Sequence, residues 1–361
     1  MKNGPAMDTH QTTAFLNETL YDSWNRFVEE SPQGDVFCYT WWLDAVTRGD
    51  FKILAVWENN RIAAGFILPF YGSGRINEPY LTRTTGVLYK KPGSESPRKR
   101  LSQERRWLNA LLDQVDINSF VQMCLHHHFT DWLPFLWHGY RQTTRYTYLL
   151  DYKTTSVEEI WRHISYRQKG IVRKALNNNL RVEEDDDMAR AHAFSCRSYG
   201  RQNRKFPYAL EDLLRLDDAV QKHGNRKIFK VTDAAGCVHA VNHVVYNRNG
   251  AYHLLSGSDP RYRGLGGHTL LLWHTIKYFS DKVPIFNFGG SDIQPIEDHF
   301  RSFGGIQTQY FRVYNDALVA NREGLRYHAG QMTHHGREIL KALRRRRITE
   351  YPAFIYKLFE R

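Results

Sequence analysis

The second half of the chain contains the stretch Asp259-Pro260-Arg261-Tyr262-Arg263-Gly264-Leu265-Gly266-Gly267-His268, between an expected strand at 251–256 and an expected helix at 269–279. Its glycines allow the backbone to turn tightly and to approach a ligand closely. The first turn of the following helix offers unpaired N–H groups and the positive end of the helix dipole, where anions bind. The stretch therefore predicts a strand–turn–helix unit that holds negatively charged oxygen atoms, with a plain tight turn as the simpler alternative.

Working outward from this turn, the pattern of apolar residues predicts a similar order of elements in both halves of the chain. Each half has a helical stretch followed by two strands joined by a short turn, at 51–58 and 61–71 and again at 227–232 and 238–246. A strand, a helix and a further strand then follow. This order indicates an α/β fold with a mixed sheet, and the two hairpins suggest two similar domains.

A domain boundary is expected near residue 150, because Ser156 and Glu159 form the pattern of a helix-capping box just after a strand. The expected domains are 1–150 and 151–330. Residues 331–361 are expected to form a basic helix or tail that includes Arg344-Arg345-Arg346-Arg347. That tail could bind phospholipid or RNA, or could simply be solvated.

Composition limits the classes of function. The chain has 361 residues, a net charge of +12 and 42% hydrophobic residues, which suits packed domains and attracts polyanions. Its four cysteines lie far apart, which argues against a disulfide scaffold or a zinc ribbon and fits a reducing cytosol. No run approaches the roughly 20 apolar residues of a membrane-spanning helix, and no secretory signal is visible. These features lead us to expect a cytoplasmic protein.

Four segments together resemble the Fem-type branch of the GNAT superfamily, which comprises the peptidoglycan bridge aminoacyltransferases and their acyltransferase relatives. The resemblance covers about residues 20–316, and its segments are 139–151, the basic helix 165–175, 194–201 and 288–305. It implies two tandem GNAT-like domains, each a mixed, mostly antiparallel sheet flanked by helices, with an active cleft near their junction.

The resemblance also implies roles for particular residues. Arg261, Gly264 and Gly266 fit the R/Q-x-x-G-x-G/A pattern with which GNAT enzymes hold the CoA pyrophosphate, and Gly267 completes the expected cofactor-binding turn. The family usually has lysine where this chain has Arg301, and arginine adds a bidentate fork for phosphate or carboxylate. Arg301 is therefore an expected substrate-binding residue. So are two residues of the basic helix, Arg167 and Lys169.

GNAT-type transfer is a direct attack of an amine on a thioester or ester carbonyl, so the enzyme must position both partners, polarise the carbonyl and accept a proton. By family analogy, backbone N–H groups around 254–257 would polarise the carbonyl. Asn242, Tyr252 and Ser256 are the expected catalytic residues, and strand alternation predicts that Tyr252 and Ser256 share one face. Satisfied sheet residues are the alternative for each.

Other polar groups give weaker signals. Asp292, Glu297, Asp298 and His299 include candidates for the general base, although helix caps and surface residues have the same pattern. His126-His127-His128 resembles a metal cluster, but neighbouring residues on a strand cannot all point the same way. No metal is therefore expected.

These observations predict an N-acyltransferase that uses acyl-CoA as co-substrate and acylates an amine on a small or cell-envelope-related molecule. One alternative is an aminoacyl-tRNA-dependent transferase acting on a peptidoglycan precursor, since tRNA and UDP phosphates would explain the basic helix. The other is an inactive GNAT scaffold that binds nucleic acid or a membrane surface.

Overall fold

The computed structural model describes residues 11–72 and 74–315. Its strands are β1 Gln11–Phe15, β2 Phe51–Glu58, β3 Arg61–Pro69, β4 Ile76–Asn77, β5 Val87–Tyr89, β6 Phe120–Cys124, β7 Arg141–Asp151, β8 Arg181–Asp185, β9 Arg226–Thr232, β10 Val238–Asn247, β11 Gly250–Ser258, β12 Ile285–Asn287 and β13 Ile306–Tyr314. They form a four-stranded sheet, β1-β2-β3-β5, and a nine-stranded sheet, β4-β6-β13-β7-β12-β11-β10-β9-β8. Most neighbours are antiparallel, but β11 and β12 are parallel, as are β4 and β6. The expected mixed, mostly antiparallel α/β fold is confirmed.

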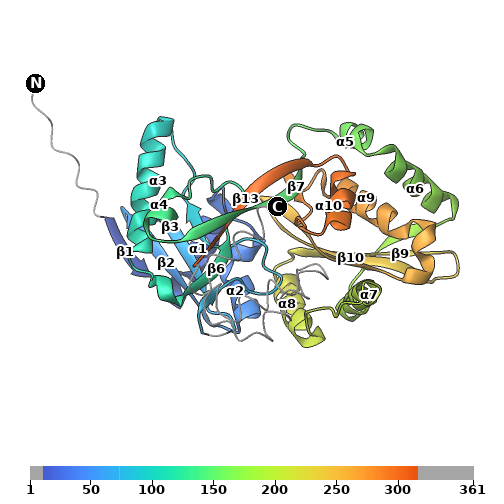
Figure 1. The fold of residues 1–361 in the computed structure, drawn as a ribbon, viewed down its shortest axis with the longest axis horizontal. Helices are drawn as coiled ribbons and strands as arrows, with labels where there is room; N and C mark the ends of the chain where they lie inside the picture. Colours follow the sequence, from blue (N-terminus) through green and yellow to red (C-terminus); the bar gives the residue numbers. More distant parts are fainter. Residues whose placement is uncertain (1–10, 73, 316–361) are drawn as a thin grey trace, which may run out of the picture. The chain divides into compact units, whose positions relative to one another are not determined.

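The α-helices are α1 Tyr21–Glu30, α2 Thr40–Thr47, α3 Pro97–Leu112, α4 Leu133–Trp137, α5 Val157–His163, α6 Tyr166–Asn177, α7 Met188–Gly200, α8 Leu210–Lys222, α9 Gly267–Phe279 and α10 Gln294–Arg301. Short 3-10 helices are η1 Glu18–Leu20, η2 Val36–Cys38, η3 Ile117–Ser119 and η4 Pro260–Leu265. Helices α9 and α6 lie on one side of β9, β10 and β11, and helices α7 and α8 lie on the other (Figure 1).

The large sheet combines strands from both halves of the chain. Strand β13 pairs with β7 along its whole length and with β6 near its end, so the last described strand lies between two strands of the first 151 residues. Strand β7 also pairs with β12. The division near residue 150 stays a prediction, and any such division cuts a continuous hydrogen-bonded sheet.

Local signals explain most element boundaries. Ser156 and Glu159 form the expected capping box, since each side chain accepts a hydrogen bond from the other residue's backbone N–H. Helix α5 ends at His163, and the Ser165 side chain caps a second helix, α6, which contains most of the basic segment 165–175. Helix α3 begins at Pro97, because Ser96 caps it and proline suits its first turn.

The sequence pattern did not mark the four edge strands, β1, β4, β5 and β8. The sequence of β8, RVEED, has little apolar character, and the strand forms because it pairs with β9. Its acidic side chains meet lysines of β9, with Glu184 Oε2 2.7 Å from Lys227 Nζ. Cross-strand pairing of opposite charges thus supports a strand that hydropathy does not reveal.

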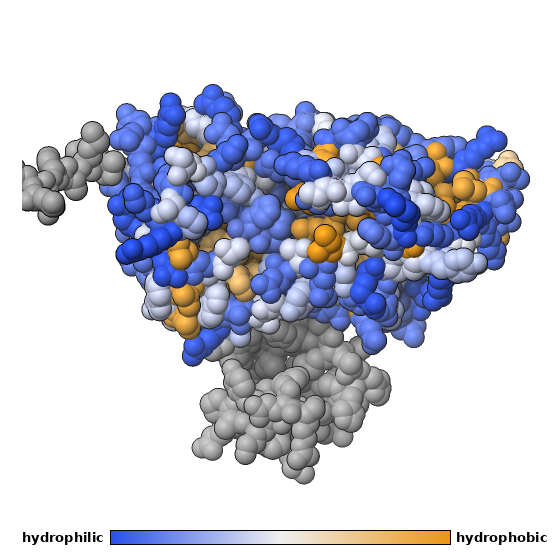
Figure 2. Space-filling model, turned by 90° about the horizontal axis from the view of Figure 1, so that it is seen from above, coloured by the Kyte–Doolittle hydropathy of each residue, from blue (hydrophilic) through white to orange (hydrophobic). Residues whose placement is uncertain are grey.

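Buried side chains form three clusters, one of which joins the two halves of the chain. It contains Phe37 and Trp42 together with Val241 and Tyr252. The Phe37 and Tyr252 rings meet edge to face, 4.7 Å apart. Hydrophilic side chains cover most of the face above α5 and α6, with apolar residues in small separate groups (Figure 2). Among the described helices, none has the length and apolar character needed to cross a membrane.

Candidate active site

The centre of the large sheet opens between two parallel strands. Strands β11 and β12 pair only through Ala251↔Phe286 and Tyr252↔Asn287. Strand β11 continues to Ser258, whereas β12 ends at Asn287. Within the described part of the chain, residues 253–258 therefore have no strand partner on the β12 side. Arg83 bonds to the Leu254 carbonyl of this stretch, and the remaining backbone groups on that side lack a strand partner, as at a sheet edge that accepts an extended ligand.

A turn after β12 keeps this opening in place. The Asn287 carboxamide oxygen accepts hydrogen bonds from the Thr147 hydroxyl at 2.6 Å and from the Gly289 N–H at 2.8 Å. Gly289 and Gly290 have φ values of 81° and 65°, and a Cβ at Gly290 would lie 2.3 Å from the Tyr146 carbonyl oxygen. Glycine is required there because the chain leaves the sheet in a left-handed conformation against β7.

A β-bulge in β11 changes which residues share a face. The register with β10 shifts between His243 and Val244. Leu255 pairs with His243 and His253 pairs with Val244, so Leu254 is the extra residue. Both Leu254 and Leu255 pack in the cluster on the α7 side. The alternation is thereby reversed beyond the bulge. The prediction that Tyr252 and Ser256 share a face is wrong: Tyr252 lies on the α7 side, and Ser256 lies on the α9 side.

On the α9 side, Ser256 borders a group of three imidazoles. The His268 Nε2 atom is 3.2 Å from the Ser256 hydroxyl, and the His268 and His299 rings are 5.4 Å apart. His253 of β11 meets Phe300 edge to face at 6.0 Å. Burial lowers the pKa of His268 to about 4, aided by Arg263, and lowers the pKa values of His253 and His299 to about 3. All three rings are neutral at pH 7.

A glutamine of α6 joins this group to two helices. The Gln168 amide nitrogen donates to Ser302 Oγ at 3.0 Å and lies 3.4 Å from His299 Nδ1, and its oxygen accepts from Thr269 Oγ1 at 3.3 Å. Asn242 also faces α9, where its amide nitrogen donates to Thr275 Oγ1 at 2.8 Å. Asn242 is buried against the helix, and its contacts are those of a satisfied sheet residue apart from its unpartnered oxygen.

On the α7 side, Tyr252 connects a small cavity to a buried carboxyl group. The cavity, of about 10 Å³, is lined by Arg83, Thr84, His127, Thr147, Tyr252, Asn287, Gly289 and Tyr310. The Tyr252 hydroxyl donates to Asp35 Oδ2 at 3.2 Å, and the Thr84 hydroxyl donates to the same oxygen. The other oxygen accepts from the Phe37 N–H at 2.9 Å and lies 3.4 Å from Cys38 Sγ.

Burial raises the pKa of Asp35 to about 7, although its hydrogen-bond donors act in the opposite direction. Burial, followed by the nearby Asp35 charge, raises the pKa of Tyr252 well above its usual value. Asp35 therefore exchanges a proton near neutral pH, whereas Tyr252 stays a neutral hydroxyl. A group that titrates near the working pH, one hydroxyl away from a cavity, has the properties of a general base.

Arg83 brings a fixed positive charge to the opening. Its guanidinium donates to the Leu254 carbonyl at 3.2 Å, at the bulge, and its Nε atom is buried without a partner. This residue belongs to the first half of the chain, and the strand it contacts belongs to the second. Arg83 thus makes the opening a site to which both halves contribute.

The turn before α9 has one open side and one covered side. A Cβ at Gly264 would meet no atom within 4 Å, whereas a Cβ at Gly266 would lie 2.7 Å from Ile171 Cγ2 and 2.9 Å from the Ile171 carbonyl oxygen of α6. Gly266 has φ 82° and caps α9. A Cβ at Gly267 would be 3.1 Å from His239 Cβ. The glycines at 266 and 267 therefore permit helix packing, and the open surface for a ligand lies at η4.

The predicted basic residues lie apart from one another. Arg261, with an exposed side chain, makes a bidentate contact with Asp259, its NH2 group at 2.9 Å from Oδ2. Arg301 pairs with Glu297 at 3.0 Å and also with Asp298. On α6, Arg167 is exposed and Lys169 donates to the Arg162 carbonyl at 2.8 Å. The structure brings Ser256 and the η4 turn to the same end of β11, and it leaves the other basic residues at the surface.

Sequence analysis missed Asp35, Arg83 and Gln168 as site residues. Asp35 caps η2, which is a role that a local sequence pattern can explain. Arg83 lies in a segment without regular structure between two strands. Gln168 lay inside the basic helix, but it is the buried member among exposed charges. Each contacts residues far away in sequence, so no local pattern marks it.

Comparisons with known proteins agree with this geometry. Residues 165–301 match the family model described as an acetyltransferase (GNAT) domain. None of the curated proteins matches the sequence. The crystal structure of FemX has 13% identity and a TM-score of 0.61, and the match covers 84% of this chain and 98% of that one.

Two further solved structures are more distant. A tandem GNAT protein from the clavulanic acid biosynthesis pathway has 11% identity and a TM-score of 0.46, with 84% of this chain and 98% of that one covered. The L-PGS of Bacillus licheniformis has 12% identity and a TM-score of 0.47, with 82% and 91% covered. The family match and the FemX fold confirm the expected architecture. Residues 165–301 therefore match a GNAT domain, and the chain shares the fold of FemX.

Proposed function

We propose that the chain is an N-acyltransferase in which an amine attacks the carbonyl of an acyl donor at the opening between β11 and β12. That opening is the observation that carries the proposal, because it leaves a row of backbone groups beside neutral polar side chains. The acceptor is an amine on a small or cell-envelope-related molecule, and the donor is acyl-CoA. The resemblance of the sequence to the Fem-type branch supports a cell-envelope acceptor by analogy.

The donor would lie on the α9 side of β11. Its pyrophosphate would meet the open η4 turn, where Gly264 leaves space and Arg261 and Arg263 are exposed. Its acyl carbonyl would accept hydrogen bonds from backbone N–H groups within 254–257. The neutral His268 imidazole and Ser256 would provide polar contacts without adding a charge.

The acceptor would approach from the Tyr252 side. As the amine nitrogen bonds to the carbonyl carbon, its proton would pass to the Tyr252 oxygen while the Tyr252 hydroxyl proton passes to Asp35. The tetrahedral intermediate would then collapse, with the C–S bond breaking and the CoA thiolate leaving. Arg83 would place its positive charge near the developing oxyanion or an acidic group of the acceptor. Asn242 would act as a positioning residue through α9, since it contacts Thr275.

The test combines ligand binding and turnover. Acetyl-CoA should raise the melting temperature of the wild type, since about 2.7 kcal/mol is gained at 100 times the dissociation constant. Gly264→Trp should abolish this shift by filling the open turn. The control is Gly200→Trp at the end of α7. That glycine also has open space around it, and α7 lies on the other side of the sheet from α9 (Figure 1). Stabilisation that survives in Gly264→Trp would reject this donor site.

A second donor, aminoacyl-tRNA, is favoured by the exposed face of α6. Tyr166 is 87% exposed beside the exposed Arg167, Arg173 and Lys174, and such a combination stacks bases and pairs with phosphates. Tyr166→Ala with Arg167→Glu should then reduce tRNA retention and leave the acetyl-CoA shift unchanged. If neither ligand binds and no acyl transfer is measured, the inactive scaffold is the remaining interpretation.

A further inference from the structure

His126, His127 and His128 follow β6 in a turn, where the rule of strand alternation does not apply. The Phe129 N–H donates to the His126 carbonyl at 2.8 Å and closes the turn. The three ring centroids lie between 4.0 and 5.0 Å apart. One nitrogen from each ring lies within 4.8 Å of the others. The expectation that adjacent histidines cannot converge is wrong here, because a turn brings successive side chains to one side.

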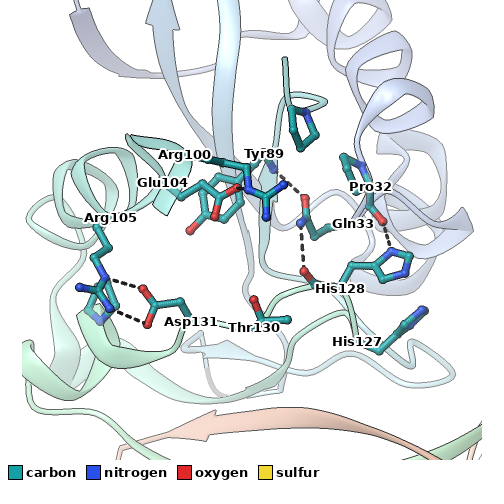
Figure 3. Close-up of a pocket in the computed structure, with 12 residues that line it drawn as sticks. Pro32, Gln33, Tyr89, Arg100, Glu104, Arg105, His127, His128, Thr130 and Asp131 are labelled. Carbon is teal, nitrogen blue, oxygen red and sulfur yellow. Dashed lines mark hydrogen bonds and ion pairs between the residues drawn. The ribbon is translucent and has the colours of Figure 1, made fainter. Parts of the chain in front are cut away.

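The hydrogen bonds around this triplet leave nitrogen atoms free in the manner of metal ligands. His128 Nδ1 is 2.9 Å from the Pro32 carbonyl, so that nitrogen carries the proton and Nε2 has a free lone pair (Figure 3). A metal-bound histidine is usually oriented by such a bond to a carbonyl. Within the described residues, His127 Nε2 is buried and has no hydrogen-bond partner. A buried unpaired nitrogen costs about 1–3 kcal/mol, which a bound cation would offset.

His126 is the conditional third ligand. Its Nδ1 accepts from the His128 N–H at 3.1 Å, so its Nε2 carries the proton in this arrangement. It ligates a metal only if that bond is released.

The triplet lies between two cavities. His127 and His128 line a cavity of about 240 Å³, and His127 also lines the small cavity beside Tyr252 (Figure 3). In the larger cavity Arg105 pairs with Asp131 at 2.7 Å and Arg100 lies 3.8 Å from Glu104. These arginines are therefore compensated by carboxylates, which lowers the repulsion that a cation would meet.

We propose that the His126–His128 turn is a binding site for a divalent transition metal, with His127 and His128 as anchoring ligands and His126 completing the set. Imidazole ligands suit Zn²⁺, Ni²⁺ and Cu²⁺. Tetrahedral ligation with Zn–N bonds of about 2.0–2.1 Å needs nitrogens about 3.4 Å apart, so the rings must move closer from separations of up to 4.8 Å when the ion binds. The bound ion would tie the end of β6 to the Pro32 segment after α1, next to the acyl-transfer opening.

The experiment titrates Zn²⁺ into the full chain after EDTA treatment and dialysis, using calorimetry, and repeats the titration with Co²⁺ using visible absorption. The wild type should bind one equivalent and gain melting temperature. His127→Asn and His128→Asn should each weaken binding by about tenfold or more. The matched control is His334→Asn with His335→Asn, an adjacent histidine pair outside the described residues, and it should bind like the wild type.

Two further measurements keep the result decisive. The variants should melt like the EDTA-treated wild type, which separates ligand loss from unfolding. His126→Asn should weaken Zn²⁺ binding if the third ligand joins, and His127 and His128 remain the required pair in either case. Failure of the wild type to bind one equivalent at pH 7, or unchanged binding in His127→Asn, overturns the proposal. Acetyl-CoA binding is measured separately, so this outcome does not depend on the proposed function.

Discussion

At the scale of single residues, Asp35 carries the most unusual chemistry in the described chain. Its carboxyl group is 1% exposed and accepts hydrogen bonds from Tyr252, Thr84 and the Phe37 backbone. No cation is among the hydrogen-bond partners that the structure gives it. Hydroxyl donors alone do not replace water around a carboxylate, so the neutral form is favoured at neutral pH. The protonated form of Asp35 stabilises the folded protein, whereas the proposed reaction needs the ionised form.

The stability effect has a definite sign. The folded pKa of about 7 lies above the unfolded value near 3.8, so the folded state keeps a proton that the unfolded state has lost between these values. The free energy of unfolding should therefore fall by about 1.4 kcal/mol per pH unit from this group in that window, and level off above pH 7. Asp35→Asn should remove this slope. Urea unfolding of both proteins from pH 4.5 to 8 checks it, and parallel curves would contradict it.

The activity effect follows from the proposed proton route. Because Asp35 must be ionised to accept a proton, kcat/KM should rise with pH through an apparent pKa near 7, and this inflection should vanish in Asp35→Asn. Initial rates of acyl transfer against pH measure it. An unchanged inflection in the variant would assign the titration to the acceptor amine.

Tyr252→Phe tests the same route without changing charge. The loss of the hydroxyl should lower kcat by roughly 100-fold, as for other proton-transfer groups, with little change in the KM for the donor. The control is Tyr152→Phe, which loses one partly buried hydrogen bond of 2.8 Å to the Ile276 carbonyl. Both variants should lose about 1 kcal/mol of stability, and equal kcat values for the two would argue against a role for Tyr252.

At the scale of elements, helix α6 determines what the glycines before α9 do. Ile171 of α6 occupies the space next to Gly266, and Gln168 on the same helix bonds to α9 and to Ser302. The α6–α9 contact therefore fixes the start of α9 and leaves η4 as the open side of the turn. In the turn 259–268, Gly266 and Gly267 therefore serve helix packing, and Gly264 lies on the side that is open to a ligand.

Substitution by alanine separates these two uses of glycine. Gly266 has φ 82°, and a Cβ added there would lie 2.7 Å from Ile171 Cγ2. Gly266→Ala should therefore destabilise the protein by about 1–3 kcal/mol. Gly264→Ala meets no atom within 4 Å and should change stability by less than about 0.5 kcal/mol. Chemical denaturation measures the free energy of unfolding of both variants. A larger loss for Gly264→Ala than for Gly266→Ala would contradict the assignment of the packing contact to Gly266.

At the scale of the whole described molecule, the halves share a sheet and a buried cluster. Strand β13 lies between β7 and β6, and Tyr252 of the second half reaches Asp35 of the first. Arg83 of the first half contacts β11 of the second. Cleaving the chain near residue 150 would leave β6 and β7 without β13, with their backbone groups unpaired.

The two halves should therefore not fold separately. Residues 1–150 expressed alone should lack a cooperative thermal transition, whereas the full chain should unfold with coincident transitions by far-ultraviolet circular dichroism and tryptophan fluorescence. Co-expression of 1–150 with 151–361 is the control, because it restores the missing strand. Independent cooperative unfolding of 1–150 would show that the shared sheet is dispensable.

The sequence by itself determined most of the helices and strands and the strand–turn–helix unit before α9. Periodicity marked β9, β10 and α9, and Ser156 with Glu159 marked the start of α5, because these signals depend on neighbours a few residues away. The resemblance to Fem-type proteins came from the order of several such segments. Residues whose partners are local were therefore predictable.

Only the tertiary structure decided which side chains meet. The bulge at Leu254 placed Ser256 with His268 and separated it from Tyr252, since one extra residue reverses every later side chain of a strand. The pairing of Asp35 with Tyr252 spans 217 positions, and the bond between His128 Nδ1 and the Pro32 carbonyl spans 96. Burial and long-range contact create these groupings, and both depend on the packing of the folded chain.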